Sequence, residues 1–399
     1  MGVLDDPTGI VERVEDVGAP NRFAVLPMEG WDGTDDGRPT PLVRRRWSRF
    51  GTSGAGLVWG GEAFAVSAGA RANPRQRCVG PSAADDLAEL RSLLASDQVA
   101  GLQLTHSGRW ATVSRPARRD PLLDTRRTGP LLTPAELDRT ADDFVAAALL
   151  ARDAGFDFVD VKMCHGYLLH ELLSGPGPLA VRAELHAATV GRVRAEGVRV
   201  GVRLSAFDVV PHRPGPNGVG EPEAAVERWG FAEPVELLDL LGVDLVCVTG
   251  GSPYYCPHAQ RPAYFPPTDG YLPPEDPLVG VARLLDAAAR IKRARPATTV
   301  VASGVSYLQE HVGNVASAVV RGGGADLVGL GRMMLSYPSL AADVLAGRPL
   351  ETRQICRTFS DCTSAPRSGL VSGCWPLDDL YKARPDRVRL VAAKRGRDE

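Results

Sequence analysis

Eight short apolar segments recur along this chain, and each is followed by a stretch with the periodicity of an amphipathic helix. The segments are residues 22–28, 56–63, 99–106, 156–163, 198–205, 243–250, 298–304 and 325–332. Short apolar runs separated by helix-length stretches are typical of repeated βα units around a parallel sheet. Eight such units predict an α/β fold, the (β/α)8 TIM barrel, whose active site lies at the carboxyl ends of the strands.

Polar residues stand at or close to the ends of these segments. Since the carboxyl ends of barrel strands share one rim, side chains that are far apart in the sequence are expected to gather around one site. The candidates for this rim are Glu29, Glu62, Gln103, His106, Lys162, His165, Arg203, Thr249, Ser303 and Arg332.

The length of 399 residues suits a single barrel with insertions, because such barrels span about 200 to over 400 residues as one domain. We expect residues 1–350 to form the barrel and residues 351–399 to form a C-terminal extension packed on or beside it. Three connections after strands are long, at residues 108–132, 207–231 and 252–273. Long loops on this face usually act as lids or binding loops; the aromatic-rich segment 252–273 favours that role, and decoration without function is the alternative for the other two.

The helical stretches carry boundary signals. The sequence from Thr133 to Glu136, Thr-Pro-Ala-Glu, predicts a helix with Thr133 as its N-cap and Pro134 in its first turn. The same stretch ends at Gly155, and glycine after the last periodic residue is typical of helix C-termini.

Charge and hydropathy exclude several classes of function. The chain has 44% hydrophobic and 24% charged residues and a formal net charge of −2, whereas nucleic-acid and membrane-surface proteins show a strong basic bias. No apolar run approaches the ~20 residues of a membrane span, and the N-terminus lacks the basic and apolar regions of a secretory signal. We therefore expect a cytoplasmic protein with a small-molecule substrate and no nucleic-acid or membrane partner. A homo-oligomer is left open.

The last two strand segments end in glycine, as Ser303-Gly304 and Gly331-Arg332. In barrels, the loops after strands seven and eight commonly form a phosphate site from backbone N–H groups. Glycine allows a close approach of the backbone, and Arg332 can add positive charge. The alternative is that these glycines only form tight turns. Neither a GxxxxGK[ST] phosphate loop nor an HExxH zinc motif is present in the sequence.

Four segments, in a fixed order, resemble one family. They are residues 21–28 (NRFAVLPM), 101–109 (GLQLTHSGR), 154–169 (AGFDFVDVKMCHGYLL) and 324–338 (GADLVGLGRMMLSYP). Together they resemble the Old Yellow Enzyme family of FMN-dependent ene-reductases, which includes the barrel domain of 2,4-dienoyl-CoA reductases. The resemblance implies that FMN lies across the strand ends and that NADH or NADPH is the electron donor.

The resemblance also implies a role for individual cofactor-binding residues. Pro27, Met28 and Ala63 would contact the isoalloxazine edge, and Gln103 would bond the pyrimidine ring. Arg203 would lie near N1 and the C2 oxygen, where a cation favours the anionic reduced flavin. The further residues of this implied FMN site are Glu29, beside the flavin, and Ser303, Gly304, Gly331 and Arg332, at the phosphate end.

By the same resemblance, the substrate chemistry follows the fourth strand. Hydride from NAD(P)H would pass through FMN N5 to an activated C=C bond of an unsaturated carbonyl compound. Lys162 and His165 would stabilise the enolate oxygen, and Tyr167 would donate the proton. Lys162 replaces the first His of the family's usual pair, and an ammonium is a more flexible point charge.

Two further departures from the family pattern concern Glu29 and the tail. The family commonly has Thr, Cys or His where this chain has Glu29, and a carboxylate there would oppose added electron density on the flavin unless it is protonated or paired, with Lys162 as a candidate partner. A salt bridge away from the flavin is the alternative. Dienoyl-CoA reductases carry closely spaced cysteines for a 4Fe–4S cluster, whereas Cys356, Cys362 and Cys374 are more widely spaced, so no metal site is expected.

Three alternative functions stay open. The flavin could run in the opposite direction, in dehydrogenation or aromatisation of a ring substrate. Lys162 could form a Schiff base as in a lyase of the aldolase type. The protein could also bind flavin without turnover.

Overall fold

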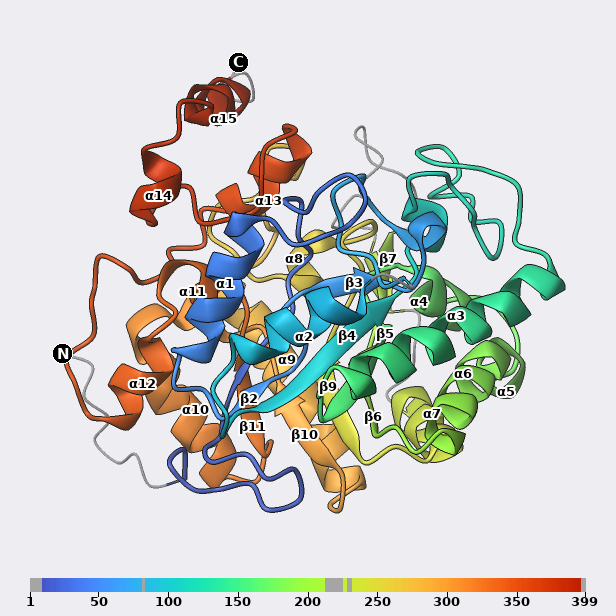
Figure 1. Ribbon diagram of the computed structural model, residues 1–399, viewed down its shortest axis with the longest axis horizontal. Coiled ribbons are helices and arrows are strands. Elements are labelled where there is room, and N and C mark those ends of the chain that lie inside the picture. The colour runs from blue at the N-terminus through green and yellow to red at the C-terminus, as the bar shows by residue number, and fades with distance from the viewer. Residues whose placement is uncertain (1–8, 81–82, 212–224, 228–231, 396–399) are drawn as a thin grey trace.

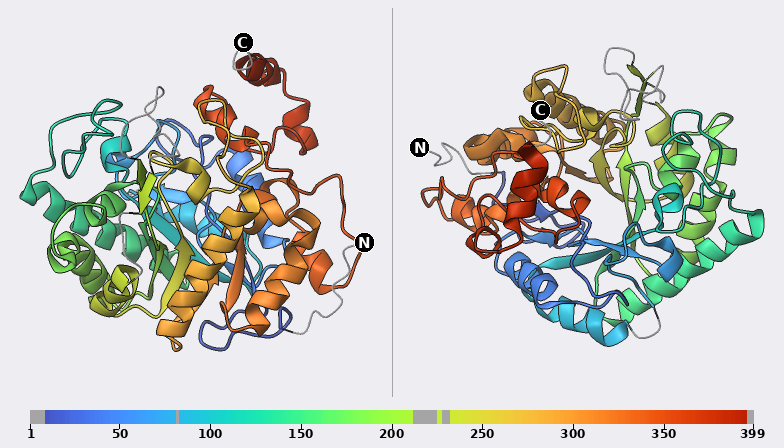
Figure 2. Two further views of the ribbon diagram at one scale, coloured as in Figure 1. Left: turned by 180° about the vertical axis from the view of Figure 1, so that it is seen from behind. Right: turned by 90° about the horizontal axis from the view of Figure 1, so that it is seen from above.

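The computed structural model describes residues 9–80, 83–211, 225–227 and 232–395. Its centre is a closed ring of parallel strands surrounded by helices (Figures 1 and 2). Each of the eight predicted segments supplies one strand of the ring, which confirms the (β/α)8 barrel. Around the ring the strands are β2 (Leu57–Val58), β1 (Phe23–Val25), β11 (Leu327–Leu330), β10 (Thr299–Ala302), β9 (Leu245–Thr249), β6 (Val200–Ser205), β5 (Phe158–Met163) and β4 (Val99–Thr105), and β4 pairs with β2 to close it.

The second predicted segment is interrupted. After β2 the chain leaves the ladder and returns as β3 (Ala63–Ala65), which pairs with the outer half of β4. A separate antiparallel pair, β7 (Val209–Pro211) and β8 (Ala225–Glu227), lies in the long connection that follows β6. Residues 212–224 and 228–231 of that predicted loop lie outside the described residues.

Helices cover the outside of the ring and its carboxyl-end loops. The principal ones are α1 (Pro41–Gly51), α2 (Ala84–Ser92), α3 (Pro134–Asp153), α6 (Glu184–Ala195), α7 (Ala232–Leu241), α9 (Pro277–Ala294), α10 (Val312–Arg321) and α12 (Leu340–Leu345). Shorter helices are α4 (Leu168–Leu173), α5 (Leu179–Arg182), α8 (Pro257–Gln260), α11 (Arg332–Ser336), and the 3-10 turns η1 (Ala68–Ala70), η2 (Gly108–Trp110) and η4 (Val305–His311).

Helix α3 begins and ends as its sequence predicts. The Thr133 hydroxyl accepts a hydrogen bond from the Glu136 N–H, and the Glu136 carboxylate accepts one from the Thr133 N–H at 2.8 Å. Pro134 occupies the first turn, where a missing N–H costs nothing. The helix stops before Gly155, which has a φ of 87° and so suits glycine.

The pleat of the strands sorts side chains between the barrel interior and the helix layer. On β5, Val159 and Val161 face the helices and belong to the large core, whereas Phe158 lies inside the ring against Trp59, with ring centroids 5.3 Å apart. Because successive side chains alternate, Asp160 and Lys162 point inward above Phe158. The interior is therefore apolar at its base and charged toward the carboxyl ends.

The tail folds back beside the opening of the barrel as α13 (Asp361–Arg367), α14 (Asp379–Lys382) and α15 (Arg387–Arg395) (Figure 1). A small apolar cluster that includes Trp375 and Tyr381 holds these helices together. Asp378 accepts hydrogen bonds from Arg45 at 2.8 Å and from Arg49 at 2.5 Å, both on α1. These contacts hold the tail against α1 of the barrel; the division into a barrel (residues 1–350) and an extension (residues 351–399) stays a proposal.

Three whole-chain features complete the fold. No helix among the described residues combines the length and the apolar character needed to cross a membrane. The seven cysteines are all free thiols. Within the described ranges, no group of three or more His, Cys, Asp or Glu side chains is arranged to hold a metal ion.

A buried ion-pair network ties α1 to the second strand segment. Arg46 donates to Asp32 at 2.7 and 2.9 Å and to Glu62 at 3.0 Å, and the Trp47 indole donates to Glu62 at 2.9 Å. Glu62 was a candidate for the rim of the site, but these partners hold it inside the protein, where it is fully buried. Its role is structural, because a buried carboxylate needs such partners.

Arg46→Ala is expected to destabilise the fold by about 3–5 kcal/mol, because it leaves two buried carboxylates without their cation. Urea unfolding followed by circular dichroism measures the loss. Arg44→Ala is the matched control, since Arg44 and Glu89 are each 40% exposed and such a pair contributes at most about 1 kcal/mol. Equal losses for the two variants would contradict the assigned role of Arg46.

Candidate functional site

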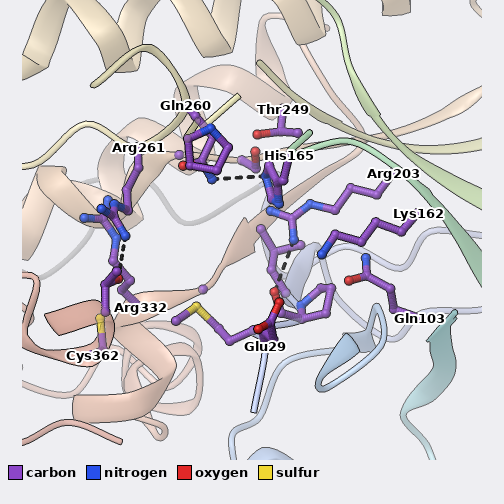
Figure 3. Close-up of a pocket in the computed structure, with 18 of the residues that line it drawn as sticks. Glu29, Gln103, Lys162, His165, Arg203, Thr249, Gln260, Arg261, Arg332 and Cys362 are labelled. Carbon is purple, nitrogen blue, oxygen red and sulfur yellow. Dashed lines mark hydrogen bonds between the residues drawn. The ribbon is translucent and has the colours of Figure 1, made fainter. Parts of the chain in front are cut away.

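A cavity of about 300 Å³ opens at the carboxyl ends of the strands (Figure 3). All the residues that the family resemblance assigned to the site line it except Ala63; of the other rim candidates, Thr249 lines it and Glu62 and His106 do not. The assigned residues that line it are Pro27, Met28, Glu29, Gln103, Lys162, His165, Tyr167, Arg203, Ser303, Gly304, Gly331 and Arg332. Residues that were not among the predicted site residues also line it, among them Trp31, Tyr254, Gln260, Arg261, Cys362, Thr363 and Arg367.

Besides the buried Glu62, two candidates at strand ends do not reach the cavity. Ala63 lies in β3 beside Gln103, and its carbonyl accepts a hydrogen bond from the Gln76 amide at 3.0 Å. The ring of His106 accepts a hydrogen bond from the Gly108 N–H at 3.0 Å, and burial lowers its pKa to about 4. His106 is therefore a neutral residue that shapes its own loop.

Two cations line the floor of the cavity, and a buried carboxyl group lies behind Gln103. Gln103 donates to Asp160 at 2.5 Å, and burial raises the pKa of Asp160 to about 7. Lys162 and Arg203 are register neighbours on β5 and β6. Arg203 donates to the Pro27 carbonyl at 3.2 Å, and its Nε has no hydrogen-bond partner among the described residues. The floor therefore keeps one guanidinium N–H of Arg203 without a partner in the described structure.

Glu29 is held by neutral donors. Its Oε1 accepts hydrogen bonds from the Trp31 indole and from the Asn73 amide, both at 3.1 Å, and its Oε2 accepts one from the Tyr167 hydroxyl. The expected pairing with Lys162 is not seen in the described part of the chain; Lys162 Nζ instead lies 4.0 Å from the centroid of the Tyr167 ring. Burial lowers the pKa of Lys162. Lys162 therefore lies over the Tyr167 ring, while the Glu29 carboxylate accepts the hydrogen bond of the Tyr167 hydroxyl.

His165 lies on a tight turn after β5. It has a φ of 64° and the following Gly166 a φ of 74°; a side chain on Gly166 would meet the Ser252 hydroxyl at 2.6 Å. This turn directs the His165 ring to the cavity, where its Nε2 lies 3.1 Å from the Gln260 amide nitrogen (Figure 3). Burial, and then the nearby Arg203 and Lys162, lower the pKa of His165 well below its usual value. His165 is therefore neutral and suited to hydrogen bonding.

The opposite end of the cavity is built for an anion. Arg332 is 8% exposed and donates to the Pro262 carbonyl at 2.7 Å, but its Nη1 has no hydrogen-bond partner in the described structure. Gly304 has a φ of 90°, and a side chain placed on Gly331 would meet no atom closer than 3.6 Å. The Ser303 hydroxyl, by contrast, donates to the Val248 carbonyl at 2.6 Å. This end of the cavity therefore offers a buried cation with a donor that has no partner among the described residues.

The aromatic segment 252–273 covers one side of the cavity. The Tyr254 ring stacks on the Trp110 ring at 3.6 Å, with an angle of 11° between the planes, and lies 6.5 Å from the Tyr167 ring. Helix α13 of the extension supplies Cys362 and Arg367 on another side. The predicted binding role of this segment is supported by its place in the cavity wall.

Residues 14–215 match the profile of the NADH:flavin oxidoreductase / NADH oxidase family. The chain belongs to this family. A related NADPH dehydrogenase from a Geobacillus species is 28% identical over 337 residues, covering 80% of this chain and 87% of the relative. Shorter matches include an NADPH dehydrogenase from Bacillus velezensis, 28% identical over 167 residues, 40% of this chain and 49% of the relative.

Solved structures with low sequence identity share the fold of this flavin oxidoreductase family member. A 2-naphthoyl-CoA reductase complex superimposes with a TM-score of 0.75 at 17% identity, over 94% of this chain and 58% of that one. Histamine dehydrogenase from a Rhizobium species gives 0.69 at 18%, over 93% and 52%, and morphinone reductase gives 0.64 at 19%, over 86% and 91%. This chain thus spans somewhat more than half the length of the first two structures.

Glu29→Gln in this oxidoreductase is expected to lower the pKa of Tyr167. Burial raises the pKa of Tyr167 well above its usual value, and the Glu29 carboxylate raises it further; the amide removes the second effect. Ultraviolet difference titration of the tyrosinate band, with Tyr167→Phe as the baseline, measures the shift. Glu12→Gln is the control, because Glu12 is an exposed partner of Arg22. An unchanged titration in Glu29→Gln would contradict the contact.

Proposed function

We propose that this protein is an FMN-dependent oxidoreductase that takes hydride from NADPH or NADH and reduces the activated C=C bond of an unsaturated carbonyl compound. Membership of the flavin oxidoreductase family supports the redox chemistry. The observation that carries the proposal is the grouping of Lys162, His165 and Tyr167 around one cavity with Gln103 and Arg203 on its floor. In the proposed reaction these residues would hold a carbonyl substrate above the flavin.

The residues present fit FMN. Arg203 and Arg332 each keep a buried guanidinium nitrogen without a hydrogen-bond partner in the described structure, and such orphan donors are costly unless a ligand meets them. Arg203 and Gln103 would hold the ring, and Gly304, Gly331 and Arg332 would hold the phosphate. Pro27, Met28 and Ala63 remain proposed contacts along the ring edge. When bound, FMN supplies hydride transfer, which no side chain can perform.

The chain's own residues would handle the substrate oxygen and the proton. Lys162 and the neutral His165 would hold the carbonyl oxygen as negative charge develops there. The Tyr167 hydroxyl would give its proton to the substrate carbon. For this step the Tyr167 O–H would turn from Glu29 to the substrate, and a proton from solvent, carried by the Glu29 carboxyl group, would return to the Tyr167 oxygen. This order avoids a phenolate beside a carboxylate in a buried site.

The same contact favours a second candidate function, removal of hydrogen from a ring substrate. When Tyr167 receives a proton from the substrate and passes its own to Glu29, the charge of the pair changes from −1 to zero. Neutralisation is the easier direction in a buried site.

The Schiff-base alternative also stays open, because burial lowers the pKa of Lys162. Borohydride trapping with a carbonyl substrate tests it.

The test begins with colour. Purified protein is expected to be yellow, or to become so on addition of FMN, to be bleached by NADPH or NADH without oxygen, and to recover its colour with 2-cyclohexenone. Protein that neither carries nor binds FMN contradicts the proposal. If the reduced protein stays bleached when an enone, a quinone or oxygen is added, it is a flavin-binding protein without turnover. Reduction of the bound flavin by a saturated ring ketone would instead favour the dehydrogenation candidate.

A further inference from the structure

Arg261 lines the cavity but has no part in the proposed chemistry. It follows α8, the short helix in the aromatic segment 252–273. Its neighbour Gln260 contacts His165 at 3.1 Å, so α8 connects the carbonyl-binding side of the cavity to the place where Arg261 lies. Figure 3 shows the Arg261 guanidinium on the side of the cavity opposite Lys162 and Gln103, near Arg332 and Cys362.

The contacts of Arg261 hold it without neutralising it. Its Nη1 donates to the Thr363 hydroxyl at 2.5 Å, on helix α13 of the extension. No carboxylate of the described residues forms an ion pair with it. The neighbouring cation Arg367 has its own partner, Asp269. Burial, and then the charges of Arg332 and Arg367, lower the pKa of Arg261 to about 9, so the guanidinium stays charged near neutral pH.

The charges around the cavity do not balance. Glu29 is the single carboxylate among the described residues that line it, and it is already satisfied by three donors. The cations that line it are Lys162, Arg203, Arg261, Arg332 and Arg367. In the proposed function, Lys162, Arg203 and Arg332 have assigned ligands and Arg367 has Asp269. Arg261 is left as a positive charge without an anion, and such a charge in a partly buried place is costly.

We infer that Arg261, held by Thr363 and flanked by Arg367, binds an oxyanion of the substrate, a carboxylate or a phosphate, at a distance from the reacting C=C bond. The guanidinium fork matches either group with two parallel hydrogen bonds. The inference rests on the proposed function for the carbonyl end of the same substrate. It makes the extension part of substrate selection, because Thr363 and Arg367 both come from α13.

Matched pairs of probes test the inference on the flavin-loaded protein. The first pair is 4-(3-oxocyclohex-1-en-1-yl)butanoate, whose carboxylate stands three methylene groups away from the C=C bond, and its methyl ester; the second is crotonyl phosphopantetheine and crotonyl pantetheine. The acid or the phosphate is expected to have a lower KM than its neutral partner. Arg261→Gln is expected to raise the KM of the anionic probe by about 10- to 100-fold and that of the neutral one by less than about twofold. The probe pair whose KM difference depends on Arg261 shows whether the oxyanion is a carboxylate or a phosphate.

Controls separate the inference from other causes. Arg357→Gln is the matched control, because Arg357 pairs with Glu310 and does not line the cavity. Arg261→Lys, which keeps the charge, is expected to retain part of the preference for the anion and serves if Arg261→Gln fails to fold. Equal KM changes for the anionic and neutral probes overturn the inference. So does a tenfold loss of FMN affinity with an unchanged probe preference, which would place Arg261 at the flavin phosphate.

Binding without turnover separates the inference from the proposed function. Calorimetry with the anionic probes gives their affinity whether or not they are reduced. Selective binding of an anion that depends on Arg261, with no reduction of any probe, would contradict the ene-reduction proposal and uphold the anion site. Reduction of both members of each pair with equal KM would uphold the proposed function and overturn the anion site.

Discussion

Tyr167→Phe is expected to slow enone reduction by about 10²- to 10⁴-fold while NADPH still reduces the flavin at close to the wild-type rate. The change removes a proton donor, and a positioned acid contributes about that factor. The phenyl ring keeps its place near Lys162, whose Nζ lies 4.0 Å from the ring centroid, and beside Tyr254. Stopped-flow absorbance without oxygen measures the two half-reactions separately.

The matched control for this prediction is Tyr255→Phe. Tyr255 lies in the same aromatic segment and donates to Asp120 outside the cavity, so its loss should leave both half-reactions nearly unchanged. Equal slowing of both half-reactions in Tyr167→Phe would show that the residue shapes the cavity and donates no proton. In the double variant, Glu29→Gln should slow enone reduction little beyond the effect of Tyr167→Phe, because the effects of residues that act as one unit are not additive.

Much of the barrel could be predicted because its signals are local. Each strand is a short apolar run, and the alternation on β5 places Asp160 and Lys162 on the same inner face as Phe158. The turn after β5 carries His165 and Tyr167 to the same cavity. Asp160 was nevertheless missed, although it stands two residues before Lys162 and shares its face; the period-two pattern was a signal that could have found it.

The rest depends on contacts that sequence patterns do not encode. Glu62 and His106 stand at strand ends like the true lining residues, yet partners on other elements hold them away from the cavity. Arg261 and Thr363 come from an irregular loop and from the extension, and neither has a periodicity that points to the cavity. The partner of Glu29 was expected to be a cation, and only the fold brings Tyr167 to it.

Arg203→Ala is expected to weaken FMN binding by about 10²- to 10³-fold and to make the potential of the bound flavin more negative. Arg203 is 8% exposed, with one donor on the Pro27 carbonyl and its Nε free of any described partner. Without it, the site loses the cation proposed to stabilise negative charge on the reduced ring. Arg203 also lowers the pKa of Asp160, so its removal should raise that pKa above about 7 and leave Lys162 as the cation of the floor.

Fluorescence titration with FMN and a spectroelectrochemical titration measure the two effects. Arg203→Lys is the matched variant: it keeps the charge and loses the fork, so it should preserve the potential better than the affinity. Thermal unfolding of the flavin-free protein shows whether the barrel itself tolerates the change. Because Arg203 sits beside Lys162, removal of one of two adjacent cations should cost the empty barrel little. An intact barrel with unchanged FMN affinity and unchanged potential would therefore remove Arg203 from the flavin site.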